Sequence, residues 1–177
     1  MLKHDHWAGF LATTELEYSN LQEQGTFVAV PTAEASDFVI LTQWAFKYKF
    51  DEEGYLLKYK ARIVVRGDLQ PKQDEETYAV TLVVRVFWFL IVVAAYFDLE
   101  AKQFDTINAF TNTKIRKKIW VRFLSGKQYQ LPGYILLLLR ALYGLRISPL
   151  LWYKHLCEVM QKLGLKPVLE CACLFTN

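Results

Sequence analysis

The octapeptide QFDTINAF, residues 103–110, is the most informative part of this chain. It places one carboxylate, Asp105, after an apolar segment, and an aromatic side chain, Phe110, five residues later. Such a carboxylate is poorly solvated unless it binds a cation or caps the following turn, and both interpretations stay open. A two-metal site would need more carboxylates. Asp98 and Glu100 are near in sequence, but neither is well placed along an extended strand.

Composition points to one globular domain. The chain has 177 residues, of which 53% are apolar and 22% charged, so it can bury a sizeable core. Its formal net charge of +3 is too small to indicate a nucleic-acid partner unless the charge is clustered.

Neither a membrane nor a secretory route is indicated by the sequence. The apolar run 86–97 is shorter than the roughly 20 residues that span a bilayer, and we predict a buried helix there. The first six residues lack the pattern of a signal peptide. Three cysteines with no metal-binding spacing indicate reduced thiols. We therefore expect an intracellular protein, in cytoplasm or nucleus, that is not secreted and has no membrane partner.

Periodicity and turn signals predict alternating helices and strands. Asp5 can cap the first helix, and Ser148 with Pro149 can open the last one. The predicted helices cover residues 5–25, 82–97 and 148–164, with a short turn around Ala109. The predicted strands cover residues 26–30 and 99–105, a hairpin of 41–50 with 55–67, a second hairpin within 115–129, and an apolar strand at 135–139.

The first hairpin has one apolar and one cationic face. Its loop, DEEG at 51–54, ends in a glycine where a positive φ is expected. Alternation puts aromatic side chains of the first run on one face and its lysines on the other. Like charges in a row favour a bound phosphate, or else form a solvated outer face. The cations of the second run are Lys58, Lys60, Arg62 and Arg66.

A third segment, LYGLRISP at 142–149, combines a glycine with a helix start. Gly144 would allow a ligand to approach the backbone closely, and the helix N-terminus favours anions. Helix starts of this form are common, so the segment alone indicates little.

Taken in order, these segments resemble the reverse transcriptase domain of Ty1/copia-type retrotransposons. The resemblance begins near Trp7 and runs to the end of the chain. It is carried by four blocks: WAFKYK at 44–49, YKARIVVRG at 59–67, QFDTINAF at 103–110 and ALYGLRISPLLW at 141–152.

The resemblance implies an α+β fold, namely the fingers and a partial palm of a right-hand polymerase, built from antiparallel hairpins and packed helices. Residues 1–177 would be a single incomplete domain. Residues 1–98 would hold the N-terminal helix, the fingers hairpin and a connecting helix, and residues 99–177 part of the palm.

The resemblance also implies roles for the octapeptide. Asp105 would be a catalytic ligand of two Mg²⁺ ions, and Phe110 would be a steric gate against the ribose 2′-hydroxyl. Phosphoryl transfer by such an enzyme needs cations on the developing charge and little else from the protein.

The remaining roles concern deoxynucleoside triphosphates and an RNA or RNA–DNA template-primer, the partners that the resemblance implies. Lys60 and Arg62 would meet the triphosphate, and Tyr143 and Gly144 would line the nucleotide pocket. Nucleic-acid contacts would come from Lys58, Arg66 and Arg146.

The sequence departs from the family at several points. The Tyr-Val-Asp-Asp motif, which supplies the other two carboxylates, is expected after Phe175, but the sequence ends at Asn177. Thr111-Asn112-Thr113 stands where the family prefers Leu-Asn-Gly. The family's Pro-Pro-Gly-Phe is missing after Val121-Arg122.

These departures lead us to expect a truncated RNA-directed DNA polymerase domain that is inactive as it stands, with the missing C-terminal part of the polyprotein as a possible partner. The alternatives are a non-catalytic nucleic-acid-binding remnant and a non-functional product of a decayed element.

Overall fold

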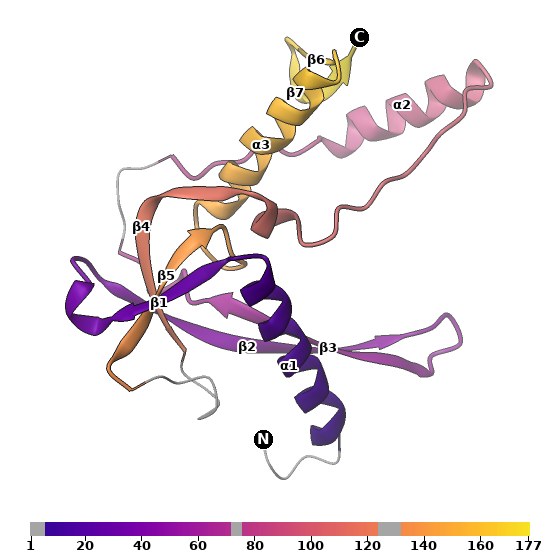
Figure 1. Cartoon of the computed structure of the whole chain (residues 1–177). Coiled ribbons are helices and arrows are strands. Elements are labelled where there is room, and N and C mark those ends of the chain that lie inside the picture. The colour runs from indigo at the N-terminus through magenta and orange to yellow at the C-terminus, as the bar shows by residue number, and fades with distance from the viewer. Residues whose placement is uncertain (1–5, 72–75, 124–131) are drawn as a thin grey trace.

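The computed structural model describes residues 6–71, 76–123 and 132–177, which form a mixed α+β fold (Figure 1). The elements are, in order, α1 (Trp7–Glu23), β1 (Phe27–Pro31), the 3₁₀ turn η1 (Thr32–Glu34), β2 (Val39–Phe50), β3 (Leu56–Val65), α2 (Val84–Tyr96), the 3₁₀ turn η2 (Ala109–Asn112), β4 (Lys114–Phe123), β5 (Tyr134–Arg140), α3 (Ser148–Lys162), β6 (Lys166–Val168) and β7 (Cys171–Thr176).

Five strands form one curled sheet in the order β1-β5-β4-β2-β3. All neighbours are antiparallel except β2 and β4, which pair in parallel. The predicted first hairpin is confirmed as β2 and β3, with Gly54 at φ +87° in its loop. Register places Lys47 opposite Lys60 and Lys49 opposite Lys58, so the predicted cationic face also exists.

The N-terminal helix α1 packs on the apolar face of this hairpin. The Phe10 ring lies 4.9–5.1 Å from the ring centroids of Phe46, Tyr48 and Tyr59, and edge-on contacts of this kind favour a fixed orientation. The predicted helix is therefore confirmed, beginning at Trp7. Asp5, its predicted cap, lies outside the described residues.

The core lies between the sheet, α1 and the segment after β5. It contains Leu21, Ile40, Ile63, Val65, Ile119, Val121, Leu136, Leu138, Leu142 and Leu145. The predicted apolar strand is β5, which is apolar because it lies between β1 and β4. Its antiparallel partner β4 holds the first half of the predicted second hairpin, and the second half falls on 124–131, outside the described residues.

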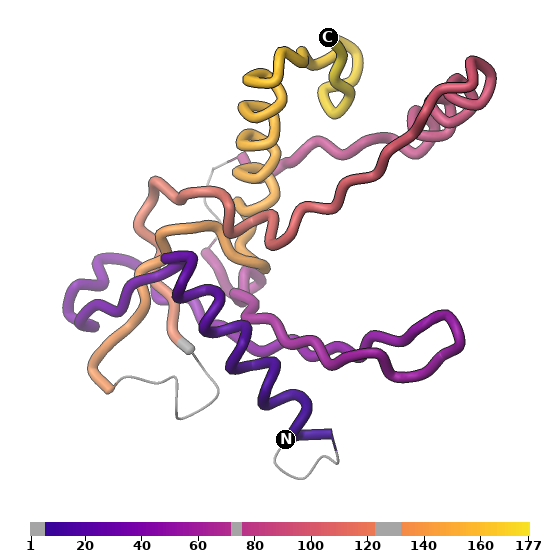
Figure 2. The backbone as a smooth tube through the Cα atoms, turned by 45° about the vertical axis from the view of Figure 1, so that its right-hand side comes forward, coloured from indigo at the N-terminus to yellow at the C-terminus, as the bar shows by residue number. Residues whose placement is uncertain are grey.

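The apolar helix is confirmed as α2, but its predicted burial is wrong. None of its residues is buried, and the side chains of Phe89 and Tyr96 are 65% and 80% exposed. Figures 1 and 2 show α2 extending away from the sheet at the end of two extended segments. Apolar composition predicts burial only if another element covers the helix. No helix within the described ranges is long and apolar enough to cross a membrane.

The predicted strand 99–105 is also absent. Residues 99–106 have no regular secondary structure, and the side chains of Phe104 and Ile107 are 89% and 82% exposed. A strand requires a neighbour for its backbone hydrogen bonds, and no described strand pairs with this segment. The short turn near Ala109 is confirmed as η2.

The last helix is confirmed as α3, but Ser148 is not its cap. Ser148 is the first helical residue and is fully buried, and its hydroxyl donates to the carbonyl oxygen of Leu142 at 2.7 Å. The β6–β7 hairpin, which the sequence did not predict, is attached to α3 where the Tyr153 hydroxyl donates to the Ala172 carbonyl at 3.1 Å.

The contrast between core and α2 gives a stability test. Ile63→Ala removes a side chain that is 1% exposed and should cost about 2–5 kcal/mol of unfolding free energy. Phe89→Ala should change it by less than about 0.5 kcal/mol. Urea denaturation measures both, and a comparable loss for Phe89→Ala would mean that α2 is packed.

Candidate functional site

The segment after β5 is fixed against the end of β3. The Val65 N–H donates to the Tyr143 carbonyl at 2.8 Å, next to Gly144 at φ +88°. A β-carbon on Gly144 would overlap the Val65 carbonyl oxygen, and one on Gly67 would overlap the Gly144 carbonyl oxygen. Both positions therefore require glycine. The sequence singled out Gly144 for the close approach of a ligand, whereas its close neighbour is the Val65 backbone, and it did not single out Gly67.

This contact brings three predicted site residues together from three separate segments. The Arg62 guanidinium lies over the Tyr143 ring, 4.5 Å from its centroid. The Phe110 ring lies on Tyr143 with 5.0 Å between centroids and 59° between planes. Arg62 comes from β3, Phe110 from η2, and Tyr143 from the segment after β5. The cation–π contact orients the guanidinium without using its hydrogen-bond donors.

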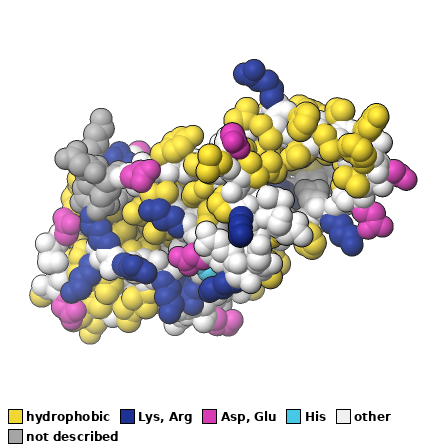
Figure 3. Space-filling view, turned by 90° about the horizontal axis from the view of Figure 1, so that it is seen from above, with side chains coloured by type: hydrophobic (Ala, Val, Ile, Leu, Met, Phe, Trp, Pro, Cys, Tyr) yellow, Lys and Arg dark blue, Asp and Glu magenta, His cyan; other side chains and the backbone are white. Residues whose placement is uncertain are grey.

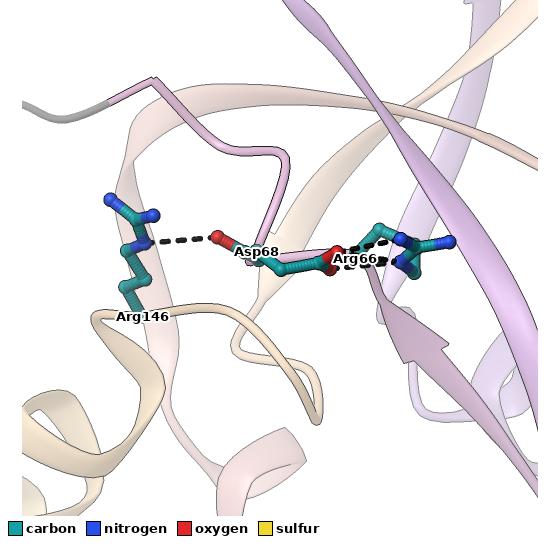
Figure 4. Close-up of polar contacts among 4 residues, drawn as sticks. Arg66, Asp68 and Arg146 are labelled. Atoms are coloured by element: carbon teal, nitrogen blue, oxygen red, sulfur yellow. Dashed lines mark hydrogen bonds and ion pairs between the residues drawn. The ribbon is translucent and has the colours of Figure 1, made fainter.

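Two further predicted residues, Arg66 and Arg146, make polar contacts just after β3 (Figure 4). Arg146 donates from Nε to the Gly67 carbonyl at 2.9 Å, so it helps hold the segment in place. Arg66 forms a two-pronged ion pair with Asp68, with Nη2–Oδ2 at 2.6 Å and Nε–Oδ1 at 2.8 Å. Because Arg66 follows the last residue of β3 and already has a carboxylate partner, it stands apart from the row of hairpin cations.

That row produces a concentrated positive field. Partial burial lowers the pKa of Lys60, and repulsion from Arg62, Lys49 and Lys58 lowers it further. A bound anion would relieve this repulsion. The face is therefore suited to a phosphate ligand.

Sequence reasoning missed Glu17, which lies on the predicted first helix. Burial raises the pKa of Glu17, although a hydrogen bond from the Ile63 backbone and attraction to Arg62 and Lys60 oppose the shift. Because β3 is the edge strand, its outer backbone groups have no strand partner, and Glu17 of α1 meets one of them. A carboxylate on an amphipathic helix gives no sequence signal for such a role.

Asp105 is not part of the assembled group. Its side chain is exposed in the extended segment 99–106, and within the described ranges no three histidine, cysteine, aspartate or glutamate residues converge to hold a metal ion. One carboxylate does not satisfy the oxygen ligands that Mg²⁺ requires, so the described residues do not by themselves fit the expected magnesium site.

Comparisons with known proteins identify the relatives of this chain. Residues 25–177 match the family described as reverse transcriptase (RNA-dependent DNA polymerase). The chain is 28% identical over 166 residues to the retrovirus-related Pol polyprotein from transposon TNT 1-94 of Nicotiana tabacum. The aligned region covers 91% of the chain and 12% of that protein. It is 26% identical, over 92% of its length, to the corresponding polyproteins from transposons RE2 and RE1 of Arabidopsis thaliana.

The chain spans only 11–12% of the length of these relatives. No solved structure matches it.

Gly144→Ala tests the contact between the two segments. It should destabilise the fold by about 1–2 kcal/mol for the left-handed backbone alone, plus the cost of moving the Val65 carbonyl. Gly133→Ala is the matched control, because Gly133 has φ +81° with no atom near its missing β-carbon. Equal losses in urea denaturation would contradict the close contact.

Glu17→Gln tests the effect of burial on the Glu17 carboxylate. Because the pKa of Glu17 is raised in the folded state, the wild-type protein should lose stability as pH rises from the ordinary value of 4.5 through the folded value. The variant lacks this loss, so its stability relative to wild type should increase with pH. Thermal unfolding at a series of pH values measures this, with exposed Glu15→Gln as control. A difference that does not vary with pH would refute the interpretation.

Proposed function

The chain belongs to the reverse transcriptase (RNA-dependent DNA polymerase) family, as a portion related to copia-type transposon Pol proteins, and from this premise we propose that it forms the fingers and part of the palm of an RNA-directed DNA polymerase. Residues 1–98 are the fingers side and residues 99–177 the palm side of one incomplete domain. Its partners are deoxynucleoside triphosphates and an RNA or RNA–DNA template-primer, inside the cell and away from membranes.

The observation that carries this proposal is the contact of Arg62, Tyr143 and Phe110, which joins three of the family blocks in space. Arg62 and Lys60 bind the triphosphate, since the guanidinium keeps its donors free while it rests on the Tyr143 ring. Phe110 stands beside Tyr143, where an aromatic edge can exclude a 2′-hydroxyl.

The nucleic-acid contacts follow from the same arrangement. Tyr143 and Gly144 line the nucleotide pocket, and Arg146, fixed to the Gly67 carbonyl, has further donors for the template strand. Lys58 and Arg66 contact phosphates outside the pocket, although Arg66 must exchange its Asp68 partner to do so. Contacts of this kind give affinity without reading sequence.

The metal half of the site is incomplete within these residues. Asp105 would supply one magnesium ligand, and further carboxylates would have to come from additional chain. The exposed apolar side chains of α2 and of residues 99–107 support a role as the surface on which such a segment completes the palm. When bound, magnesium would stabilise charge on the transferring phosphoryl group.

Residues 1–177 alone are therefore proposed to lack polymerase activity. A second candidate function, nucleic-acid binding without catalysis, is favoured by the asymmetry of the site, because its phosphate-binding half is assembled while its metal half is not. A product without function is the remaining alternative.

One experiment on residues 1–177 separates these candidates. We expect no primer extension on an RNA template with Mg²⁺, but salt-dependent binding of an RNA–DNA duplex, measured by fluorescence anisotropy. Arg62→Ala should weaken binding by about 1.5–3 kcal/mol and reduce the salt slope by about 1. Arg85→Ala, exposed on α2, is the control.

Two outcomes would contradict this proposal. Nucleotide incorporation that Asp105→Asn abolishes would show that the residues are active as they stand. If no duplex binds at low salt, both the polymerase portion and the non-catalytic nucleic-acid-binding protein are ruled out. Only a product without function is then left.

A further inference from the structure

β4 carries an irregularity that concentrates positive charge. Lys114 pairs with Arg140 and Ile119 with Leu138, so β4 advances five residues while β5 advances two. The surplus residues loop out of the ladder, and Figure 1 shows β4 sharply bent. A bulge of this kind breaks the alternation of side chains, so neighbouring residues point outward together. The exposed cations presented here are Lys114, Arg116, Lys117 and Lys118.

The bulge forms one wall of a cleft of about 950 Å³. The opposite wall is α3, which adds Lys154 and Lys162. Six lysines or arginines line the cleft against two carboxylates, Asp37 and Glu158, a formal excess of four positive charges in a chain whose net charge is +3. Figure 3 shows lysine and arginine side chains gathered over β4 and α3, whereas hydrophobic side chains dominate the end where α2 lies.

The cleft also offers apolar and aromatic surface between the charges. Phe38, just before β2, lines it and is 49% exposed. On the other side lie Ile147, just before α3, and Leu151 of α3. Cations that follow a backbone, combined with an aromatic face on which a base can stack, are the features of single-stranded nucleic-acid sites. A metabolite phosphate or an acidic peptide would not need the exposed aromatic ring.

The cleft is separate from the phosphate-binding face of the fingers. None of its lining residues belongs to β3, and β2 lies between β4 and β3 in the sheet. Lys58, Lys60 and Arg62 are therefore free to act independently of it.

We propose that the cleft between the β4 bulge and α3 binds a single-stranded nucleic acid, with its phosphates on the cations and a base on Phe38. The choice of a nucleic acid over another polyanion rests on the proposed function. The site would hold single-stranded RNA or DNA outside the polymerase pocket, for instance a stretch of template not yet copied.

The charge half of this proposal is tested by anisotropy with a labelled, unstructured oligouridylate on residues 1–177. Lys114→Gln/Arg116→Gln/Lys118→Gln should reduce the slope of log affinity against log salt by about 2 and weaken binding roughly 100-fold at 0.1 M salt. The control Arg85→Gln/Lys102→Gln/Lys166→Gln removes the same charge from exposed positions outside the cleft. Equal losses in the two triple variants would overturn the proposal.

The base-stacking half is tested with Phe38→Ala. It should weaken oligouridylate binding about 5- to 150-fold, leave the salt slope unchanged, and leave the affinity for inorganic polyphosphate, which has no bases, unaltered. An unchanged oligouridylate affinity, or an equal loss for both ligands, would refute a nucleic-acid site. Circular dichroism checks that each variant is folded.

A failure of the cleft proposal can be distinguished from a failure of the proposed function. The proposed function depends on duplex binding that Arg62→Ala weakens, whereas the cleft depends on oligouridylate binding that Arg62→Ala spares. If Arg62→Ala reduces duplex binding while the cleft triple variant binds oligouridylate like its control, only the cleft proposal fails. If the cleft triple variant alone loses oligouridylate binding and no variant affects the duplex, the fingers proposal fails.

Discussion

The contact between the end of β3 and the segment after β5 is the constraint on which the rest of the site depends. Val65 and Tyr143 are joined by a backbone hydrogen bond, and the carbonyl of Val65 faces a position where only glycine fits. Interiors packed this closely have little freedom to shift. Because Tyr143 is fixed in this way, Arg62 and Phe110 meet on its ring although they come from distant parts of the chain. The site is a consequence of backbone packing.

The charged side chains form two separate groups of cations, and the carboxylate of Asp105 belongs to neither. The hairpin face holds several cations in a row, with Glu17 as a partly buried counter-charge at the strand edge. The β4 bulge holds a second group, in a cleft that includes no residue of β3. Asp105 lies in neither region and stays exposed. Positive groups can be arranged by a single strand and its register. A magnesium site instead requires several carboxylates from separate segments, so it is the part that these residues alone leave unformed.

Local patterns predicted the elements whose conformation is set locally. The first hairpin follows from alternation and from Gly54, and the blocks that carry the resemblance identified Arg62, Phe110 and Tyr143, which the structure brings together. Burial of α2 and a strand at 99–105 were wrong because both depend on a partner that the described residues do not supply. Glu17 and the β4 bulge could not be predicted, since pairing register and the helix position against β3 are tertiary properties. The cations at 114–118 were visible in the sequence, but their arrangement was not.

The pairing of β1 with β5 has a consequence for how the chain is made. Phe27 pairs with Leu138, over 100 residues later, whereas β2 with β3 and β4 with β5 pair between consecutive strands. Long-range pairing of this kind slows folding and leaves strand edges open in the meantime. During synthesis the β2–β3 hairpin can therefore form early on the ribosome, while β1 must wait until β5 has left the exit tunnel. Through that interval the apolar α2 segment is already outside the tunnel, so the nascent chain exposes apolar surface that favours aggregation.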